Sequence, residues 1–433
     1  MTKKFFLSTN WTCIRRKLDA RKIADYLSKN DHKIVNDPRK ADIIILVTCA
    51  FSNQRTEQAI AQIRNLKKYD AELIVAGCLP AIDPERMKAV FNGRTFVTKE
   101  IEKIDELFPE NKIKFDDLED ANSPWENVDE TRLYDSLKKI LSKSEFIRNF
   151  YSGLETYIRK SSFFDTAVFT WYGISSENPF FIRPSYGCLG NCSYCAIYKA
   201  IGKMKSKPFD TCVSEFKKGL SQGYKNFILD ADDVGCYGVD IGSSFSQLLD
   251  EITSVPGDYQ IDIHYIHPHW VIKHIEGLEK ILRRGKIRRI LSSIQSGNPR
   301  VLKLMHRFPD TEKMKEAYLR LKKAYPDLLL ETECICGFPT ETMEEFKDTL
   351  NFILEVRFGW GAFFPFSCKT GTHCESLEPK IQEDEILRRI KFAKKFLKNH
   401  NYDVRYAKYF RKLSQNILVY SDIESMSKLT KKN

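Results

Sequence analysis

The sequence has no long hydrophobic run. Nowhere in its 433 residues do apolar side chains extend over the roughly 18 positions that a membrane-spanning helix needs. The first apolar stretch, which follows two lysines near the start, is also too short for the hydrophobic region of a signal peptide. These absences predict a cytoplasmic protein with no membrane partner. In that compartment the twelve cysteines are expected to be thiols, metal ligands or catalytic groups rather than disulfides.

The charge balance does not by itself identify a class of binding partner. There are 69 basic and 58 acidic residues, which give a formal net charge of +11. Such a charge is compatible with a polyanionic partner such as RNA, but lysines on solvated helix faces produce the same balance. The composition, with 42% hydrophobic and 29% charged residues, is that of an ordinary globular protein. The length predicts about two to four domains.

Three cysteines stand close together in residues 187–195, which read GCLGNCSYC. Cys188, Cys192 and Cys195 have CxxxCxxC spacing, which can reach three corners of one 4Fe-4S cubane. Because such clusters normally take four thiolates, a set of three predicts that a small molecule completes the shell. A structural zinc ion would need a fourth ligand, and no His or Cys follows until Cys212. Three unrelated core cysteines are the other alternative.

This loop resembles the cofactor-cleaving loop of the radical S-adenosylmethionine (SAM) superfamily. In that family the open iron binds the amino and carboxylate groups of SAM, and one electron cleaves SAM to a 5′-deoxyadenosyl radical. The resemblance implies a 4Fe-4S cluster and SAM as cofactors. It also implies an electron donor such as flavodoxin or ferredoxin as a partner.

The first part of the chain, residues 1–108, predicts a small flavodoxin-like doubly wound α/β domain. Strands are predicted at 5–7, 41–47 and 72–76, and helices at 19–29 and 52–68. A cysteine follows each strand: Cys13, Cys49 and Cys78. Because the carboxyl ends of neighbouring parallel strands lie at one edge of the sheet, we expect these cysteines to converge. Their convergence predicts a second cluster, with three buried structural thiols as the alternative.

The order of these features resembles the radical SAM methylthiotransferases, which modify tRNA bases or a ribosomal-protein side chain. The N-terminal domain of that family carries three cysteines in the contexts found here. These are a cysteine with an acid six residues later (Cys13 and Asp19), Thr-Cys-Ala around Cys49, and Gly-Cys-Leu around Cys78. The resemblance implies that they hold an auxiliary 4Fe-4S cluster with an open iron, which carries or donates sulfur.

Beyond this domain, residues 109–179 predict a partly helical, aromatic-rich linker or substrate-binding insertion. Residues 180–375 alternate strands with amphipathic helices in the manner of the partial (β/α)6 TIM-type barrel of radical SAM enzymes. Strands are predicted at 180–184, 226–230, 260–266, 289–295, 329–335 and 361–366. The three-cysteine loop follows the first of them, at the carboxyl ends where barrel chemistry takes place.

Later motifs resemble family elements that hold SAM, among them Ser-Ile-Gln-Ser-Gly at 293–297 and Gly-Phe-Pro at 337–339. The resemblance implies that six residues contact SAM: Tyr194, Asp232, Ser293, Gln295, Gly337 and Phe338. For Asp232 an ordinary loop acid is the alternative. The predicted substrate-binding residues are Asp19, His267 and Lys203. Lys203 follows a glycine where the family has arginine, and the two cations are not equivalent at a forked site.

His264, His267 and His269 are of a residue type that binds metals. Their position at the end of the third barrel strand, where the family lines its active site, favours a role in lining the site instead.

Three departures from the family pattern stand out. Arg16 and Val47 occupy positions where the family usually has asparagine. The linker is longer than expected. The tail, residues 376–433, predicts a helical extension with a basic helix at 383–400 and a short strand at 416–420. It is too short for the five-stranded RNA-binding TRAM barrel with which the family usually ends.

Together these features predict a radical SAM sulfur-transfer enzyme with two 4Fe-4S clusters, which inserts sulfur or a methylthio group at an unactivated C–H bond. The missing TRAM barrel and the aromatic insertion favour a peptide or protein side chain as acceptor, including a ribosomally made precursor peptide. Adenosine in tRNA is the alternative acceptor. Two further alternatives are a single-cluster enzyme with the N-terminal domain as a substrate-binding module, and a non-catalytic RNA- or peptide-binding relative.

Overall fold

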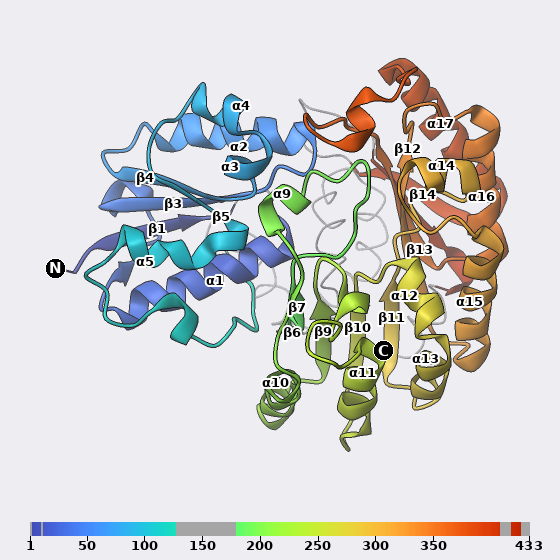
Figure 1. Ribbon diagram of the computed structural model, residues 1–433, viewed down its shortest axis with the longest axis horizontal. Coiled ribbons are helices and arrows are strands. Elements are labelled where there is room, and N and C mark those ends of the chain that lie inside the picture. Colours follow the sequence, from blue (N-terminus) through green and yellow to red (C-terminus); the bar gives the residue numbers. More distant parts are fainter. Residues whose placement is uncertain (1, 10–11, 127–178, 408–416, 426–433) are drawn as a thin grey trace, which may run out of the picture. The chain divides into compact units, whose positions relative to one another are not determined.

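The computed structural model describes residues 2–9, 12–126, 179–407 and 417–425 (Figure 1). The chain divides into two compact units, Met1–Ser176 and Glu177–Asn433. In the described parts, no helix is both long enough and apolar enough to cross a membrane. Within the predicted linker at 109–179, residues 127–178 lie outside the described residues.

The first unit contains a five-stranded parallel sheet in the order β2-β1-β3-β4-β5. Its strands are β1 (Lys4–Ser8), β2 (Lys33–Ile34), β3 (Ile43–Thr48), β4 (Glu72–Gly77) and β5 (Thr95–Val97). Its helices are α1 (Ile14–Lys29), α2 (Asn53–Leu66), α3 (Leu79–Ile82), α4 (Pro84–Lys88) and α5 (Ile104–Leu107). Short 3₁₀ turns are η1 (Pro38–Lys40), η2 (Thr98–Lys103) and η3 (Phe115–Asp117). This strand order is that of flavodoxin-like folds, so the predicted doubly wound class is confirmed.

The sheet of the first unit is built around β3, in which every residue is buried. Such a strand reads as one continuous apolar run because helices cover both of its faces. Buried side chains of α1, such as Leu27, pack with Phe5 and Ile45 in one core cluster. The sequence pattern missed β2 and β5 because two- and three-residue edge strands carry almost no periodicity.

The second unit contains an eight-stranded sheet in the order β14-β15-β13-β12-β11-β10-β9-β6. Its parallel strands are β6 (Phe180–Ile182), β9 (Asn226–Asp230), β10 (Gln260–His264), β11 (Ile287–Leu291), β12 (Leu329–Cys336) and β13 (Trp360–Pro365). A separate two-stranded ribbon consists of β7 (Ser185–Tyr186) and β8 (Lys205–Ser206). Six parallel strands in an open sheet are the predicted partial barrel, and that fold class is confirmed.

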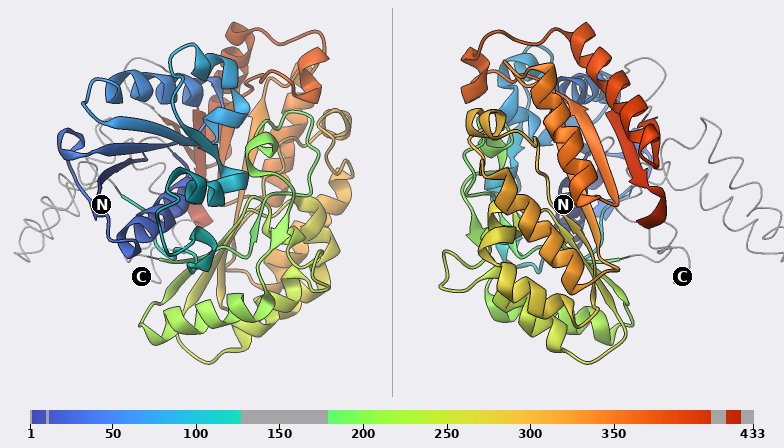
Figure 2. Two further views of the ribbon diagram at one scale, coloured as in Figure 1. Left: turned by 60° about the vertical axis from the view of Figure 1, so that its left-hand side comes forward. Right: turned by 90° about the vertical axis from the view of Figure 1, so that its right-hand side faces the viewer.

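Helices connect successive strands of this sheet and pack on its outer face (Figures 1 and 2). They are α10 (Phe209–Ser221), α11 (Phe245–Ser254), α12 (Pro268–Lys273), α13 (Ile275–Leu282), α14 (Pro299–Leu304), α15 (Thr311–Ala324), α16 (Met343–Val356) and α17 (Glu383–Asn399). The one-turn helix α9 (Tyr198–Ile201) lies instead between β7 and β8 of the ribbon. The 3₁₀ turns are η5 (Val234–Cys236) and η6 (His373–Ser376).

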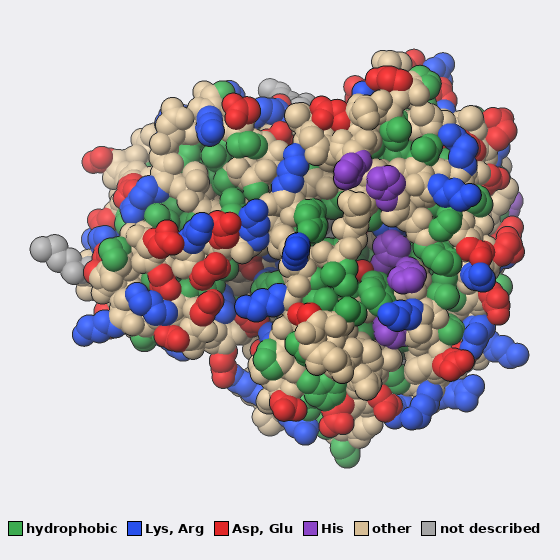
Figure 3. Space-filling model, in the orientation of Figure 1, with side chains coloured by type: hydrophobic (Ala, Val, Ile, Leu, Met, Phe, Trp, Pro, Cys, Tyr) green, Lys and Arg blue, Asp and Glu red, His purple; other side chains and the backbone are tan. Residues whose placement is uncertain are grey.

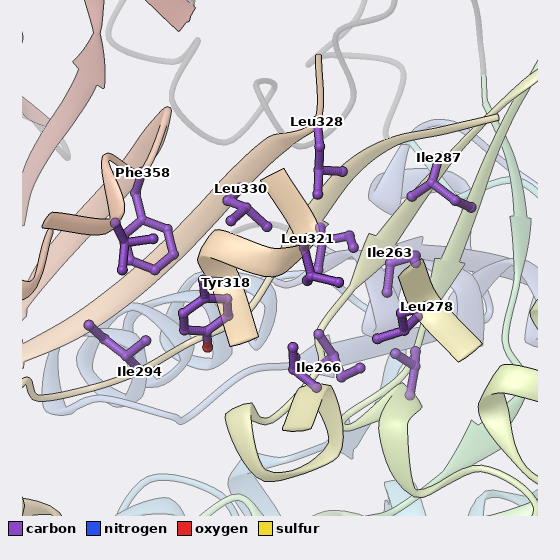
Figure 4. Packing of buried hydrophobic residues seen from close by; sticks show 14 of the residues in the cluster. Ile263, Ile266, Leu278, Ile287, Ile294, Tyr318, Leu321, Leu328, Leu330 and Phe358 are labelled. Carbon is purple, nitrogen blue, oxygen red and sulfur yellow. The ribbon is translucent and has the colours of Figure 1, made fainter. Parts of the chain in front are cut away.

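The two faces of the barrel sheet differ in chemistry. Ile263 and Leu330 pack against helix residues such as Leu321 in one large apolar core (Figure 4). Neighbouring positions in the same strands point to the other face, because side chains alternate along a strand. There Arg288 forms two hydrogen bonds with Asp262, of 3.0 and 2.7 Å. The face turned away from the helices is therefore polar and charged.

The tail is not simply a helical extension, which corrects that prediction. After α17 the chain forms β14 (Tyr402–Ala407) and β15 (Ile417–Asp422), and β15 pairs antiparallel with β13. The predicted strand at 416–420 corresponds to β15. The sequence analysis missed β14, although the alternation of buried Tyr402 and Val404 with the charged Asp403 and Arg405 is itself a strand signal.

Candidate functional site

The cysteines of the first unit follow the carboxyl ends of its strands. Cys49 comes directly after β3 and Cys78 directly after β4. These strands are neighbours, with Thr48 paired to Gly77 at their last residues, so the two cysteines leave the sheet side by side. Cys13 follows β1, the neighbour of β3 on the other side, and is the N-cap residue of α1.

A glycine sets the turn at one of these cysteines. Gly77 has a φ of +94°, and a Cβ atom there would lie 2.5 Å from the carbonyl oxygen of Thr48. That same carbonyl accepts a 3.0 Å hydrogen bond from the backbone N–H of Cys78. Only glycine combines this backbone conformation with such a close approach. The Gly-Cys-Leu motif thus has a local structural reason.

The thiols of this first site influence one another. A hydrogen bond with Cys49 lowers the pKa of Cys13 well below its ordinary value, and the charges of Arg15 and Arg16 lower it further although burial opposes them. The same hydrogen bond, together with burial and the charges of Cys13 and Cys78, raises the pKa of Cys49. Three interacting thiols beside cationic side chains form a donor set suited to thiolate ligation.

Arg16 is part of this site. The sequence analysis noted it only as a departure from the family pattern. Its Nη1 atom donates to the Cys78 sulfur at 3.7 Å and also to the Thr98 hydroxyl. Its Nε atom lies 2.8 Å from the Asp19 carboxylate, and the two side chains are only 3% and 7% exposed. The predicted substrate-binding residue Asp19 is therefore a buried ion-pair partner of Arg16.

The second site is the loop between β7 and α9. Gly187 has a φ of +70°, and a Cβ there would lie 2.3 Å from the Lys203 carbonyl oxygen. The N–H of Gly190 donates to the Cys188 sulfur at 3.1 Å. A Cβ on Gly190 would lie 3.2 Å from that sulfur and 3.8 Å from the sulfur of Cys192. The loop thus curls its first two sulfur atoms around a position without a side chain.

Segments distant in the sequence hold this loop through Ser193. Its N–H donates to the Met305 carbonyl at 3.0 Å and its hydroxyl to the Leu304 carbonyl at 2.7 Å. Its own carbonyl accepts from the N–H of Cys374 at 2.9 Å. The end of α14 and the segment after β13 therefore fix the loop in place.

Burial keeps two of these thiols protonated. It raises the pKa of Cys188 to about 12, with a further contribution from the charge of Asp233. It also raises the pKa of Cys195 to about 11, assisted by the charge of Cys192. Ionising such thiols requires a compensating positive charge, which a bound metal group supplies.

Arg307 provides a cation at this second site. Its Nη1 atom lies 3.5 Å from the Cys192 sulfur and 3.2 Å from the Tyr194 hydroxyl, and its Nη2 atom donates to the Ser293 carbonyl. Burial and then the charge of Arg307 hold the pKa of His267 well below its ordinary value. The sequence places this arginine two positions after Met305, but its contacts depend on the folded chain.

The sequence analysis selected Asp232 as a SAM contact and overlooked the adjacent Asp233. Its Oδ1 atom accepts from the N–H groups of Gly235 at 3.1 Å and His267 at 3.2 Å, and burial raises its pKa to about 6. Asp232, the predicted SAM contact, is only partly buried at the same loop. The signal in the sequence was Asp-x-Gly, a common turn in which the acid caps its own loop.

The other predicted SAM contacts divide into two groups. Ser293 and Gln295 follow β11 and are partly exposed, as Tyr194 is in the cysteine loop. Phe338 is fully buried, and a Cβ on Gly337 would lie 2.3 Å from the Ile386 side chain of α17. In this structure the side chain of Phe338 and the space above Gly337 serve packing.

The predicted substrate-facing residues also differ in exposure. His267 is the N-cap residue of α12 and accepts a 3.1 Å hydrogen bond from the N–H of His269. Lys203 is exposed, and its backbone bridges to Cys188. His264 is buried and His269 exposed, and histidine side chains gather on the face of the second unit shown in Figure 3.

Among the described residues, no three His, Cys, Asp or Glu side chains are grouped so as to hold a single metal ion. A cubane cluster contains four irons and spreads its thiolates more widely than one ion does. The cysteine sets remain compatible with clusters.

Two family models match the chain. The radical SAM superfamily matches residues 182–353, and uncharacterized protein family UPF0004 matches residues 4–98. A similar curated protein is the "Probable threonylcarbamoyladenosine tRNA methylthiotransferase" of Pyrococcus horikoshii, 28% identical over 350 residues, which are 80% of this chain and 73% of that protein. This chain is a radical SAM methylthiotransferase homologue.

A second relative of this methylthiotransferase homologue is the "Ribosomal protein uS12 methylthiotransferase RimO" of Thermodesulfovibrio yellowstonii, 28% identical over 382 residues, or 87% of this chain and 78% of that protein. Among solved structures, the radical SAM methyltransferase TsrM from Kitasatospora setae superposes with a TM-score of 0.59 at 11% identity, covering 86% of this chain and 75% of that one. At that identity the likeness concerns the fold alone.

The family resemblance stated from the motifs is confirmed, and with it an enzyme fold that implies SAM and a 4Fe-4S cluster. The relatives' names divide between tRNA and a ribosomal protein, so they leave the acceptor open. The matched ranges contain the two cysteine sets, one in each.

Proposed function

We propose that this chain is a sulfur-transfer enzyme with two 4Fe-4S clusters that inserts sulfur or a methylthio group at an unactivated C–H bond. The observation that carries the proposal is the convergence of Cys13, Cys49 and Cys78 at one edge of a parallel sheet, in addition to the cysteine loop of the radical SAM unit. A single-cluster enzyme would not require three thiols at three neighbouring strand ends.

The residues of the two cysteine sites suit the two proposed 4Fe-4S clusters. Gly190 leaves free the position around which Cys188 and Cys192 curl, and the buried thiols need a positive group before they ionise. Gly77 turns the chain so that Cys78 leaves the sheet beside Cys49. When bound, the cluster of the cysteine loop, together with SAM, would supply hydrogen abstraction from carbon, and the auxiliary cluster would supply sulfur. This chemistry belongs to the cofactors rather than to side chains.

Residues around the cysteine loop are placed to bind and orient SAM. Arg307 donates to the Tyr194 hydroxyl and keeps a positive charge beside Cys192. Asp233, which accepts two backbone hydrogen bonds, keeps a carboxyl group at the same strand ends. A guanidinium and a carboxylate in one site are suited to the carboxylate and ammonium of an amino-acid moiety such as that of SAM.

Two classes of acceptor have support. A peptide or protein side chain is favoured by the relative named for ribosomal protein uS12. Adenosine in tRNA is favoured by the relative named for threonylcarbamoyladenosine and by the net charge of +11. A flavodoxin- or ferredoxin-type reductant remains the expected electron donor.

Iron analysis after anaerobic reconstitution tests the number of clusters. The wild-type chain should bind about eight irons, since each cubane holds four. Replacing Cys13, Cys49 and Cys78 together by alanine should leave about four, and so should replacing the three cysteines of the radical SAM loop. If the wild type holds only about four irons, and replacing the first three cysteines changes nothing, the single-cluster alternative is correct.

Mass spectrometry tests the acceptor. Nucleosides from tRNA and tryptic peptides from ribosomes are compared between cells with and without the gene. A methylthio-adenosine that follows the gene assigns tRNA as the acceptor, whereas a methylthio mass gain on a peptide assigns a protein. If both profiles are unchanged although the enzyme cleaves SAM, small ribosomally made peptides are the remaining acceptors to test.

A further inference from the structure

A buried arginine touches one of the proposed auxiliary-cluster ligands. The Nη1 atom of Arg16 donates to the sulfur of Cys78 at 3.7 Å, across 62 positions of sequence. The same atom donates to the hydroxyl of Thr98 in η2, the turn that follows β5. Arg16 therefore connects the start of α1 with two further strand ends at the edge where the three cysteines converge.

The position is an unfavourable one for a cation. Arg16 lies in the first turn of α1, where the helix dipole disfavours positive charge, and its side chain is 3% exposed. A buried charge is costly unless it is paired. Asp19, one turn further along the helix, provides a partner at 2.8 Å. The guanidinium still directs its Nη1 atom at the cysteine sulfur rather than at the carboxylate.

We propose that Arg16 is a positioning residue for the auxiliary cluster: it donates to the Cys78 sulfur and sets the reduction potential of that cluster, while Asp19 orients the guanidinium and attenuates its charge. This inference rests on the proposed function, because it requires that Cys13, Cys49 and Cys78 hold a cluster. The charge of Arg16 also acts on Cys13, so the cation influences two of the three thiols.

The physical effect has a definite sign. Reduction adds one negative charge to a cluster, and a nearby cation or an N–H···S hydrogen bond stabilises the more negative state. Arg16 should therefore make the auxiliary cluster easier to reduce. A nearby carboxylate has the opposite effect, so Asp19 should make reduction harder.

The test uses the full-length chain with Cys188, Cys192 and Cys195 replaced by alanine, so that the auxiliary cluster alone is observed. Its midpoint potential is measured by redox titration monitored by electron paramagnetic resonance. Arg16→Asn should shift the potential to more negative values, and Asp19→Asn should shift it to less negative values. Arg16→Lys should give a smaller negative shift, since lysine keeps the charge but loses the forked donors.

A matched control lies on the same helix. Arg21 pairs with Asp25 at 3.3 Å in an exposed ion pair, with side chains 43% and 46% exposed. Arg21→Asn makes the same chemical change and should leave the potential unaltered, because solvent screens exposed charges. Iron content and the cluster absorption spectrum, measured for every variant, show that the cluster is retained.

Each outcome decides something. Opposite shifts for Arg16→Asn and Asp19→Asn support the inference, because a purely structural ion pair would move the potential in the same direction or not at all. Equal potentials, or shifts of one sign, overturn it. If Arg16→Asn loses the cluster, the Asp19→Asn and Arg16→Lys variants decide by the same signs. If the parent variant binds no iron, the proposed auxiliary cluster itself is wrong; an intact cluster without shifts rejects only the role of Arg16.

Discussion

Arg389 of α17 donates to the carboxylate of Glu341 at 3.1 Å, and the two side chains are only 6% and 0% exposed. Glu341 also accepts a 2.9 Å hydrogen bond from the N–H of Gly337, so this one carboxylate joins the turn after β12 to the C-terminal helix. Burial raises the pKa of Glu341 to about 7, and the charge of Arg389 opposes that rise. The ion pair therefore fixes α17 against the Gly-Phe-Pro segment.

Removing Arg389 should destabilise the second unit strongly. Arg389→Met leaves Glu341 buried without its cation, which should cost about 3–5 kcal/mol of unfolding free energy. The neighbouring Arg388→Met is the control, because that side chain is 67% exposed and its pairs with Asp384 and Glu385 should be worth at most about 1 kcal/mol. Denaturant unfolding at equal iron content measures both. Similar losses for the two variants would contradict the role given to the buried pair.

Gly77→Ala should empty the auxiliary site. The new Cβ would meet the Thr48 carbonyl at 2.5 Å, so the turn before Cys78 must move, and about four irons should be lost. Gly223→Ala is the control that separates backbone strain from a steric clash. Gly223 also has a positive φ of +86°, but nothing lies within 4 Å of its Cβ position. That control should lose about 1 kcal/mol or more of stability but no iron. Retention of all iron by Gly77→Ala would refute the steric account.

Arg307→Lys should weaken SAM binding. Lysine keeps the charge but cannot reach the Tyr194 hydroxyl and the Ser293 carbonyl together. Loss of one charge-assisted hydrogen bond corresponds to about tenfold or more in affinity. Equilibrium dialysis of SAM on reconstituted protein measures this, and iron content should stay that of the wild type. Arg300→Lys, at an exposed ion pair with Glu345, is the control and should bind SAM normally.

Acidic pH should remove the contribution of His274 to the stability of the second unit. Its ring stacks on Trp270 and hydrogen-bonds to the Gly235 carbonyl at 3.2 Å, and burial lowers its pKa. Because the folded pKa lies below the unfolded value near 6.5, stability is fully present above about pH 6.5 and is lost as the pH falls through the folded pKa. The loss is at most about 1.4 kcal/mol per pH unit. His274→Gln should flatten this slope in unfolding curves between about pH 7.5 and 5.5; an unchanged slope would point to other groups.

The local patterns of the sequence were sufficient for most of the fold. The six parallel barrel strands overlap the predicted ones because each carries a β-branched or aromatic run between turns. Helix α1 begins at Ile14, earlier than predicted at 19, because its first turn is polar and cationic and lacks an apolar face. The edge strands β2 and β5 carried too little periodicity to be recognised.

The sequence by itself determined the two sets of cysteines, the doubly wound and barrel classes, and the family. These depend on spacing and periodicity within a few tens of residues, which the covalent chain preserves. Only the tertiary structure decided which charges meet: Arg16 with Cys78, Arg307 with Cys192, and Arg389 with Glu341. Such pairs join residues 48 to 115 positions apart. They form because burying a charge requires a partner, and packing alone determines which partner is near.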